Sequence, residues 1–200
     1  MGQNLQKHQE MKKIKEEILN LKSSPLYNYR TENNFFPVIG EGNHDAKIIF
    51  IGEAPGLNEA KTGKPFCGAA GKFFDELLEA AKIVREEVYV GNIVKDRPPE
   101  NRDPTPQEIA VYGPFLIRQI DIIQPEIVAT LGRFSMTYIM EQFGLKEKLQ
   151  PISKIHGQVF EASASYGKIK IIPMYHPASA LYNPKNRSVM IDDIKILSTF

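Results

Sequence analysis

The sequence predicts an α/β fold in which helices cover both faces of a parallel sheet. Four short runs rich in Ile and Val, at residues 47–51, 88–94, 127–131 and 169–174, are typical of buried strands. Helical stretches at about 70–82, 106–123 and 134–143 lie between them. Strands and helices therefore alternate along the chain, which is the pattern of a parallel sheet with helices on both faces.

Further elements complete this prediction. Residues 6–22 are expected to form a surface helix, because apolar residues recur there at helical spacing among Lys and Glu. Asp103 is expected to cap the helix that follows it or to lie near the cap, and Pro114 to bend or split that helix. Residues 155–162 and 169–174 are expected to pair as a hairpin.

Length and composition limit the possible classes of protein. A chain of 200 residues is expected to form one domain over residues 1–200, with residues 1–24 as an N-terminal helix packed on it or peripheral to it. The net charge is +1, so the chain lacks the strong overall basicity that would itself indicate nucleic-acid binding. Any DNA binding must therefore come from a local patch.

Cysteine content and hydropathy predict a protein that works inside the cell, in the cytoplasm or at the nucleoid. Cys67 is the single cysteine, so it forms no internal disulfide and cannot hold a zinc or iron–sulfur site alone. No apolar run is long enough to span a bilayer, and the first residues are too polar for a signal peptide.

Chemically versatile side chains follow the predicted strands. Glu53 lies just after the first strand, Asn92 near the end of the second and His176 after the fourth, while Gly132 follows the third. In an open parallel sheet, ligands bind beyond the carboxyl ends of the strands. A carboxylate, an amide and an imidazole are therefore expected to converge on one edge.

Each of these residues also has a structural interpretation. Asn92 either bonds a neighbouring loop or recognises a base, because one amide offers both a donor and an acceptor. His176 is either a core histidine or a hydrogen-bond donor to a leaving group. Phe66, between Gly63 and Gly68, either packs in the core or presents its ring to a flat base.

Basic residues are expected at the same edge. Residues 95–102 form a charged, proline-stiffened loop, which is either solvated surface or a contact to phosphates. The candidate DNA-backbone contacts are Lys61, Lys64, Arg97, Arg102, Lys185 and Arg187.

Taken together, the ordered segments of this chain resemble the uracil-DNA glycosylase superfamily, and most closely its thermophile-type family 4. The resemblance covers about residues 40–197. It is carried by Gly40-Glu41-Gly42-Asn43, IIFIGEAPG, TGKPFCGAAGKFFDELLEAA, VYVGNIVKDRPPENRDP, PEIVATLG, ISKIHGQVF and YHPASALYNP.

This resemblance implies a three-layer α/β/α sandwich around a four-stranded parallel sheet, with a uracil pocket. Phe66 would stack on the base, Asn92 would bond the uracil edge and reject cytosine, and His176 would bond the uracil carbonyl as negative charge builds. The loop at residues 178–182 would enter the minor groove and fill the hole left by the flipped base. Ala180 and Leu181 lie on that loop, and Leu181 would be the wedge.

The implied reaction is hydrolysis of the N-glycosidic bond between uracil and deoxyribose in DNA, by a monofunctional glycosylase of base excision repair. Ala54 stands where the best-known family of the superfamily has an Asp. The carboxylate that positions water is therefore open between Glu53 and Glu59. The expected partner is uracil-containing DNA, with the protein acting as a monomer and without a membrane.

This chain departs from the family pattern at the four cysteines that hold the family's iron–sulfur cluster. Its four cysteine positions correspond to residues near Pro25 and Asn28 and to Asp96 and Tyr112. We therefore expect no cluster and no other cofactor or metal. Local packing of Tyr112 with Tyr27 or Tyr29 is expected to replace it.

Other departures leave two further functions open. Cys67 and Gly91 alter the pocket's neighbourhood, so a glycosylase for deaminated purines is one alternative. A non-catalytic binder of DNA or uracil is the other, although the retained Phe66, Asn92 and His176 argue against it. No basic insert follows the second strand, so covalent trapping of DNA is not expected.

Overall fold

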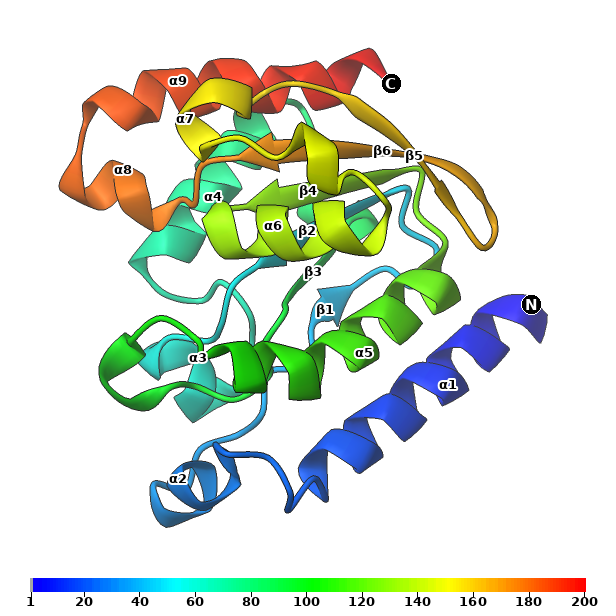
Figure 1. The fold of residues 1–200 in the computed structure, drawn as a ribbon, viewed down its shortest axis with the longest axis vertical. Helices are drawn as coiled ribbons and strands as arrows, with labels where there is room; N and C mark the ends of the chain where they lie inside the picture. The colour runs from blue at the N-terminus through cyan, green and yellow to red at the C-terminus, as the bar shows by residue number, and fades with distance from the viewer. Residues whose placement is uncertain (1) are drawn as a thin grey trace.

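A six-stranded sheet forms the centre of the molecule (Figure 1). The computed structural model describes residues 2–200, with side chains from residue 4 onward. The strands run in the order β1-β3-β2-β4-β6-β5. Their bounds are β1 Glu41–Gly42, β2 Ile48–Gly52, β3 Tyr89–Asn92, β4 Ile127–Leu131, β5 Phe160–Ala164 and β6 Gly167–Met174.

The strand directions confirm the predicted class and correct the strand count. The four central strands β3, β2, β4 and β6 are parallel, as the sequence predicts. β1 and β5 add antiparallel edges, so the prediction of four strands is too low for the whole sheet. β1 is only two residues long, too short for a periodic signal in the sequence. β5 pairs with β6 as the predicted hairpin.

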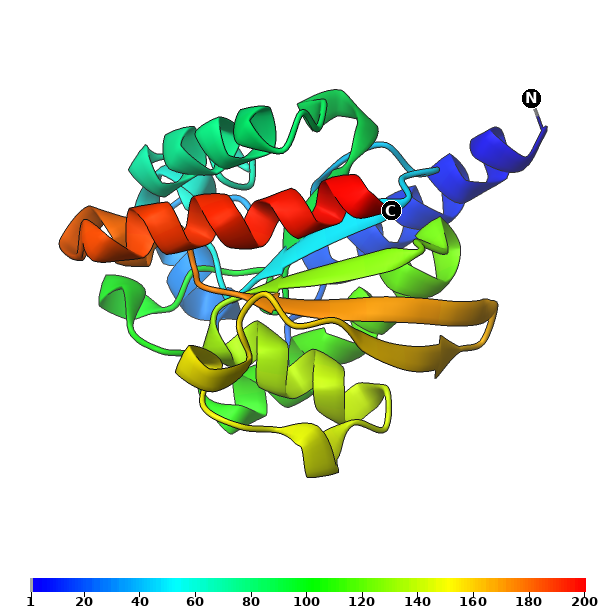
Figure 2. The same cartoon turned by 90° about the horizontal axis from the view of Figure 1, so that it is seen from above.

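Helices cover both faces of this sheet, with α4 and α9 on one side and α5 and α6 on the other (Figure 2). The helices are α1 Gly2–Leu19, α2 Tyr27–Glu32, α3 Leu57–Thr62, α4 Ala69–Ala80, α5 Pro106–Ile123, α6 Arg133–Gln142, α7 Ile152–Ile155, α8 Ala178–Tyr182 and α9 Lys185–Ile194. Short 3-10 turns lie at Arg85–Glu87, Pro99–Asn101, Lys146–Lys148 and Lys195–Thr199. In the part of the chain that the structure describes, no helix combines the length and the apolar character needed to cross a membrane.

The alternation of side chains along the strands divides the core into two. Ile49 and Ile51 of β2 pack toward α1, α5 and α6, whereas Phe50 between them packs toward α4 and α9. All three are fully buried. Burying each such side chain contributes about 1.5–3 kcal/mol to folding. Because both faces are covered, the parallel strands read as continuous apolar runs.

Asp103 lies near the start of α5, one of the two predicted alternatives, but it is not the capping residue. Thr105, not Asp103, caps the helix: its Oγ1 accepts from the N–H of Glu108, and the Glu108 carboxylate accepts from the N–H of Thr105 in return. This capping box satisfies two N–H groups that the first turn leaves free. Pro114 lies inside one continuous helix, so the predicted split is wrong. Buried residues on both sides of Pro114 hold this helix against the sheet.

A buried polar cluster ties the N-terminal segment to the sheet domain, and we call Ser24, Arg30, Asp96 and Tyr112 the N-terminal polar clamp. Nη1 of Arg30 pairs with Oδ2 of Asp96 at 3.2 Å. The Tyr112 hydroxyl donates to Asp96 at 2.5 Å and lies 2.6 Å from the Ser24 hydroxyl. All four residues are buried, so each polar group is matched away from water.

The clamp also completes the end of α1. Arg30 donates to the main-chain oxygens of Ile18 at 3.1 Å and Leu19 at 2.8 Å, carbonyls that the last turn of a helix leaves free. The Tyr112 hydroxyl bonds Ser24 and Asp96. The packing of Tyr112 with Tyr27 or Tyr29 stays a prediction.

Candidate active site

A cavity of about 550 Å³ opens at the carboxyl ends of β2, β3 and β6. It brings together Glu53, Asn92 and His176, which the sequence predicts at one edge of the sheet, and Phe66, which the family resemblance assigns to the pocket. Ala54 and Glu59 also line it, and Leu181 of α8 stands at its side. The convergence of carboxylate, amide and imidazole is thus present in the structure.

Asn92 forms part of the cavity wall, and its side chain is only 1% exposed. Within the described residues, its Nδ2 has no hydrogen-bond partner. Gly52, the last residue of β2, leaves room for it: a Cβ there would collide with Oδ1 of Asn92 and lie 3.0 Å from the Phe66 ring. A buried amide donor without a partner is a group that a ligand can satisfy.

Phe66 is held in an unusual backbone conformation beside this amide. Its φ is 52°, in the left-handed region that a residue with a large side chain rarely adopts. Its ring stacks on the imidazole of His176 with a centroid separation of 5.8 Å and an interplanar angle of 29°, and packs against Phe74 at 5.1 Å. Gly71 allows the close approach, because a Cβ there would collide with the Phe66 main chain.

Glu59 organises the loop that carries Phe66. Its two carboxylate oxygens accept main-chain N–H groups, one from Phe66 and one from Gly56 at 2.5 Å. Burial raises the pKa of Glu59, while these two bonds oppose that shift. Both oxygens are therefore occupied by the protein itself, and Glu59 joins the start of α3 to the aromatic ring.

Glu53 differs from Glu59 because its carboxylate has no hydrogen-bond partner among the described residues. Burial raises the pKa of Glu53 to about 7; the Asp103 carboxylate adds to this shift and Arg133 opposes it. The Glu53 main-chain oxygen accepts from Val94 at 3.0 Å, so the backbone is fixed while the carboxylate remains available.

His176 is a neutral imidazole at physiological pH, because burial lowers its pKa to about 4. Its Nδ1 lies 3.2 Å from the main-chain N–H of Ala178 and accepts from it. A neutral imidazole that accepts at Nδ1 carries its proton on Nε2. His176 is therefore set as a hydrogen-bond donor, with the ring packed against Phe66.

Two of the predicted DNA contacts are already engaged within the protein. Arg97 donates to Asn101 at 2.7 Å and to the Tyr29 hydroxyl at 3.0 Å. Arg102 makes a two-pronged bond to Glu108, at 2.6 and 2.9 Å. Both side chains hold the loop before α5, a role that sequence pattern alone does not reveal.

The remaining predicted DNA contacts comprise one arginine that is paired within the protein and three exposed lysines. Arg187 pairs with Glu76 and lies over the Phe73 ring at 4.5 Å. The exposed lysines form no ion pair among the described residues, namely Lys61, Lys64 and Lys185. These three lysines therefore differ from Arg97, Arg102 and Arg187, which are bound within the protein.

The predicted wedge lies on α8, which follows His176 directly (Figure 1). Ala180 is partly buried, whereas Leu181 is 49% exposed and Tyr182 is 88% exposed. The segment predicted as a loop is thus a one-turn helix that presents apolar side chains beside the cavity.

Asn58 also lines the cavity, and the sequence analysis did not single it out; Asn101 and Tyr182 line it too, within the loops predicted at residues 95–102 and 178–182. Asn101 lies in the charged loop, where its φ of 55° is left-handed, a conformation that Asn tolerates better than most residues. His156, outside the cavity, lies with its Nδ1 2.7 Å from the carboxylate of Asp193.

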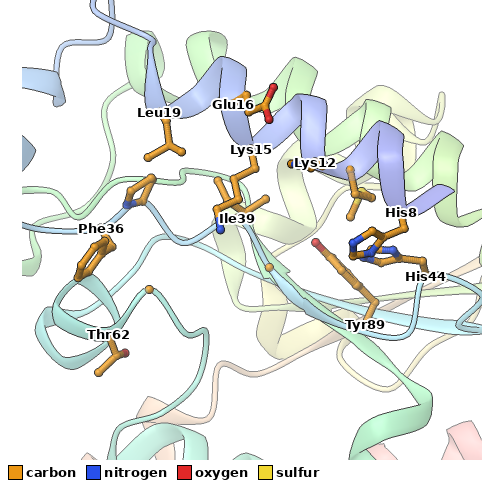
Figure 3. A pocket seen from close by; sticks show the side chains of 14 residues that line it. His8, Lys12, Lys15, Glu16, Leu19, Phe36, Ile39, His44, Thr62 and Tyr89 are labelled. Atoms are coloured by element: carbon orange, nitrogen blue, oxygen red, sulfur yellow. The ribbon is translucent and has the colours of Figure 1, made fainter. Parts of the chain in front are cut away.

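A second cavity of about 610 Å³ lies between α1, the residues around β1 and the end of α3 (Figure 3). His8, Lys12 and Lys15 of α1 face His44 and Tyr89 across it. Although it is larger, it contains none of the strand-end residues that the first cavity gathers. We therefore assign the chemistry to the first cavity.

A family model described as "Uracil DNA glycosylase superfamily" matches residues 39–195. The chain belongs to the uracil-DNA glycosylase superfamily. It is 45% identical to the type-4 uracil-DNA glycosylase of Sulfurisphaera tokodaii, over 92% of this chain and 82% of that protein. It is 42% identical to the type-4 enzyme of Archaeoglobus fulgidus, over 91% and 88%. For the type-4 enzyme of Thermotoga maritima the identity is 39%, over 95% and 94%.

These relatives correct the prediction about cofactors. The expectation of no cofactor is contradicted, because type-4 uracil-DNA glycosylases are iron–sulfur enzymes. The residues of this chain nevertheless do not fit such a cluster. Cys67, its single cysteine, is exposed on the pocket loop, and residues 4–200 contain no group of three or more His, Cys, Asp or Glu able to hold a metal ion. No step of the chemistry below passes through a cluster.

Proposed function

We propose that this protein hydrolyses the N-glycosidic bond of uracil in DNA and leaves an abasic site. The observation that carries the proposal is the unpartnered, buried amide of Asn92 beside the rings of Phe66 and His176. Such a site is complementary to a flat ligand that carries both a hydrogen-bond donor and an acceptor on its edge. The type-4 relatives, named as uracil-DNA glycosylases, support the same activity.

Base recognition belongs to Phe66 and Asn92 in this proposal. The uracil ring stacks on Phe66, as bases do on aromatic side chains. The Asn92 Nδ2 donates to the O4 carbonyl of uracil, and Oδ1 accepts from the N3 hydrogen. Cytosine presents an amino group and a bare ring nitrogen at these positions, so both bonds would be lost and the amide would remain buried without partners.

His176 acts on the leaving base. As the glycosidic bond breaks, the electron pair stays with the uracil ring and negative charge builds on its O2 carbonyl. The Nε2–H of the neutral imidazole donates to that oxygen and stabilises the anion. A donor that is already oriented costs no reorganisation when the charge appears, which makes this kind of contribution large.

Glu53 is our candidate for the carboxylate that positions the attacking water and faces the cation-like sugar. Its oxygens have no partners among the described residues, whereas both oxygens of Glu59 are used by main-chain N–H groups. Water adds to the sugar carbon, its proton passes to the carboxylate, and uracil leaves as the anion. Glu59 instead keeps Phe66 in position.

The uracil must leave the DNA stack to enter this cavity. We propose that Leu181, with Ala180 beside it, fills the space that the base vacates, and that Lys61, Lys64 and Lys185 contact the phosphates. With few such contacts, affinity should depend modestly on salt. We further propose that residues 1–200 act as one domain and as a monomer within the cell.

A cleavage assay tests the proposal. Labelled oligonucleotides with one uracil, as single strands and as U·G and U·A duplexes, are incubated with the protein and treated with alkali to break abasic sites. We expect product with the wild type and a large loss with His176→Ala. If no uracil substrate yields product while an oligonucleotide with a deaminated purine does, the substrate assignment is wrong; binding without cleavage of either would contradict the enzymatic activity.

A further inference from the structure

Lys95, three residues after Asn92, is completely buried. Its Nζ donates to the main-chain oxygen of Asn92 at 2.7 Å, to Oε1 of Gln119 at 2.6 Å and to the main-chain oxygen of Ile39 at 3.3 Å. All three acceptors are neutral, and in the described chain no carboxylate pairs with this amine. Burial accordingly lowers the pKa of Lys95 to about 7.

These bonds join three elements behind the cavity. Gln119 lies on α5 and is fully buried; its Nε2 donates to the Ile39 oxygen at 3.0 Å and to the Tyr89 hydroxyl at 3.1 Å. Ile39 and Tyr89 also line the second cavity, where Figure 3 shows both side chains. Lys95 and Gln119 therefore connect the end of β3 with α5 and with the segment before β1.

Burying an amine without a neighbouring anion costs more free energy than burying an apolar side chain of the same size. Transferring a charged amine from water into the interior is costly, and neutral acceptors offset that cost only in part. A methionine of similar length would pack at this position without that cost. What the amine adds is a short bond to the carbonyl of Asn92, the residue whose side chain forms the amide of the cavity.

We propose that Lys95 is a positioning residue for base recognition, which orients the Asn92 amide by holding the main-chain carbonyl of the same residue. This inference rests on the proposed function. The Nδ2 of Asn92 has no partner among the described residues that would fix its direction, so its aim depends on the backbone that carries it. A displacement of about 1 Å in a reacting group can cost about 100-fold in rate.

The test uses Lys95→Met, with Gln119→Leu as a matched control from the same network. Gln119→Leu removes three hydrogen bonds, one of them donated by Lys95, and leaves the Lys95–Asn92 bond in place. We expect Lys95→Met to lower the single-turnover rate on uracil about 10- to 100-fold, the range typical for a supporting partner of a site residue. Its preference for uracil over cytosine should fall as well, whereas Gln119→Leu should lose stability and keep both rate and preference.

Lys95→Gln provides a second variant, because it keeps a neutral donor and is expected to lie between wild type and Lys95→Met in base preference. Thermal unfolding of every variant gives the folded fraction at the assay temperature. If the rates fall only in proportion to the folded fraction and the base preference stays unchanged, Lys95 is structural and the inference is wrong. If the wild type releases no uracil, the proposed function fails first, and that outcome is distinguishable from the other.

Discussion

The N-terminal polar clamp and the active-site cavity are both built from buried polar groups, but they treat those groups in opposite ways. In the clamp, the Arg30 guanidinium, the Asp96 carboxylate and the Tyr112 hydroxyl all have partners. In the cavity, the amide nitrogen of Asn92 and the carboxylate of Glu53 have none among the described residues. The partnered groups of the clamp stabilise the fold, whereas the unpartnered groups of the cavity are free to bond a ligand.

The difference should also appear in mutants. Breaking the clamp removes protein–protein bonds and leaves a charge buried, so stability is lost first. Changing the cavity removes bonds that exist only with substrate, so chemistry is lost while the fold remains. The following predictions test this separation from the largest expected effect to the smallest.

Asp96→Ala should cost about 3–5 kcal/mol in the free energy of unfolding, because it leaves the buried Arg30 guanidinium without its counter-charge. Urea unfolding of both proteins measures this. At low temperature, where the variant is still folded, its preference for uracil over cytosine should match that of the wild type. A variant of wild-type stability would show that the clamp does not hold the N-terminal segment.

His176→Ala should lower the single-turnover rate about 100- to 1000-fold, the usual cost of removing one donor that stabilises a developing anion. Its affinity for DNA, measured by fluorescence anisotropy, and its unfolding midpoint should change little. His176→Gln is a control that keeps an N–H donor. Equal losses in rate and binding would instead indicate a structural histidine.

Asn92→Asp should relax the discrimination between uracil and cytosine by about 1–3 kcal/mol, the value of a good two-pronged contact to a base edge. The carboxylate presents acceptors where the amide offered a donor. Rates on matched uracil and cytosine oligonucleotides provide the measurement. Cytosine rejection as strong as in the wild type would remove Asn92 from base recognition.

Glu53 should make the rate depend on pH, because its pKa of about 7 leaves the carboxylate mostly protonated in acid. A single group of this kind predicts a fall of about tenfold from pH 8 to pH 6. Glu53→Gln should be slow and should lose this dependence. A wild-type profile that stays flat across pH 7 would argue against an ionised Glu53 in the reaction.

The same substitution should stabilise the fold in alkali. The folded-state pKa of Glu53 is raised above its ordinary 4.5, so ionisation opposes folding, and the cost grows from about pH 4.5 and is complete above about pH 7. The unfolding midpoint of Glu53→Gln should therefore exceed that of the wild type at pH 8 and equal it at pH 4. Partial exposure makes this effect small.

The parallel sheet and the converging strand ends could be predicted because both depend on local patterns. Apolar runs mark strands that are buried on both faces, and parallel strands carry their last residues to one edge. Glu53, Asn92 and His176 follow from that geometry. Phe66 required the resemblance to a family, because a phenylalanine between glycines is equally consistent with a core residue.

Other features depend on contacts between residues far apart in the chain. Arg30 meets Asp96 across 66 positions, and nothing around Arg30 in the sequence marks it as buried. The separate roles of Glu53 and Glu59 depend on which main-chain N–H groups the fold brings to each carboxylate. Arg102 and Arg187 look free in the sequence, although Glu108 and Glu76 bind them in the structure.

The strand order also determines at what stage of synthesis the site is complete. Phe66 and Asn92 belong to the first half of the chain, whereas His176 follows β6, which joins the sheet between β4 and β5. Pairings between distant strands form late in folding. A chain released before β6 therefore carries Phe66 and Asn92, which are proposed to recognise the base. It lacks His176, which is proposed to stabilise the base as it leaves. Incomplete copies of the protein should thus be unable to create abasic sites, and only a finished chain should act on the genome.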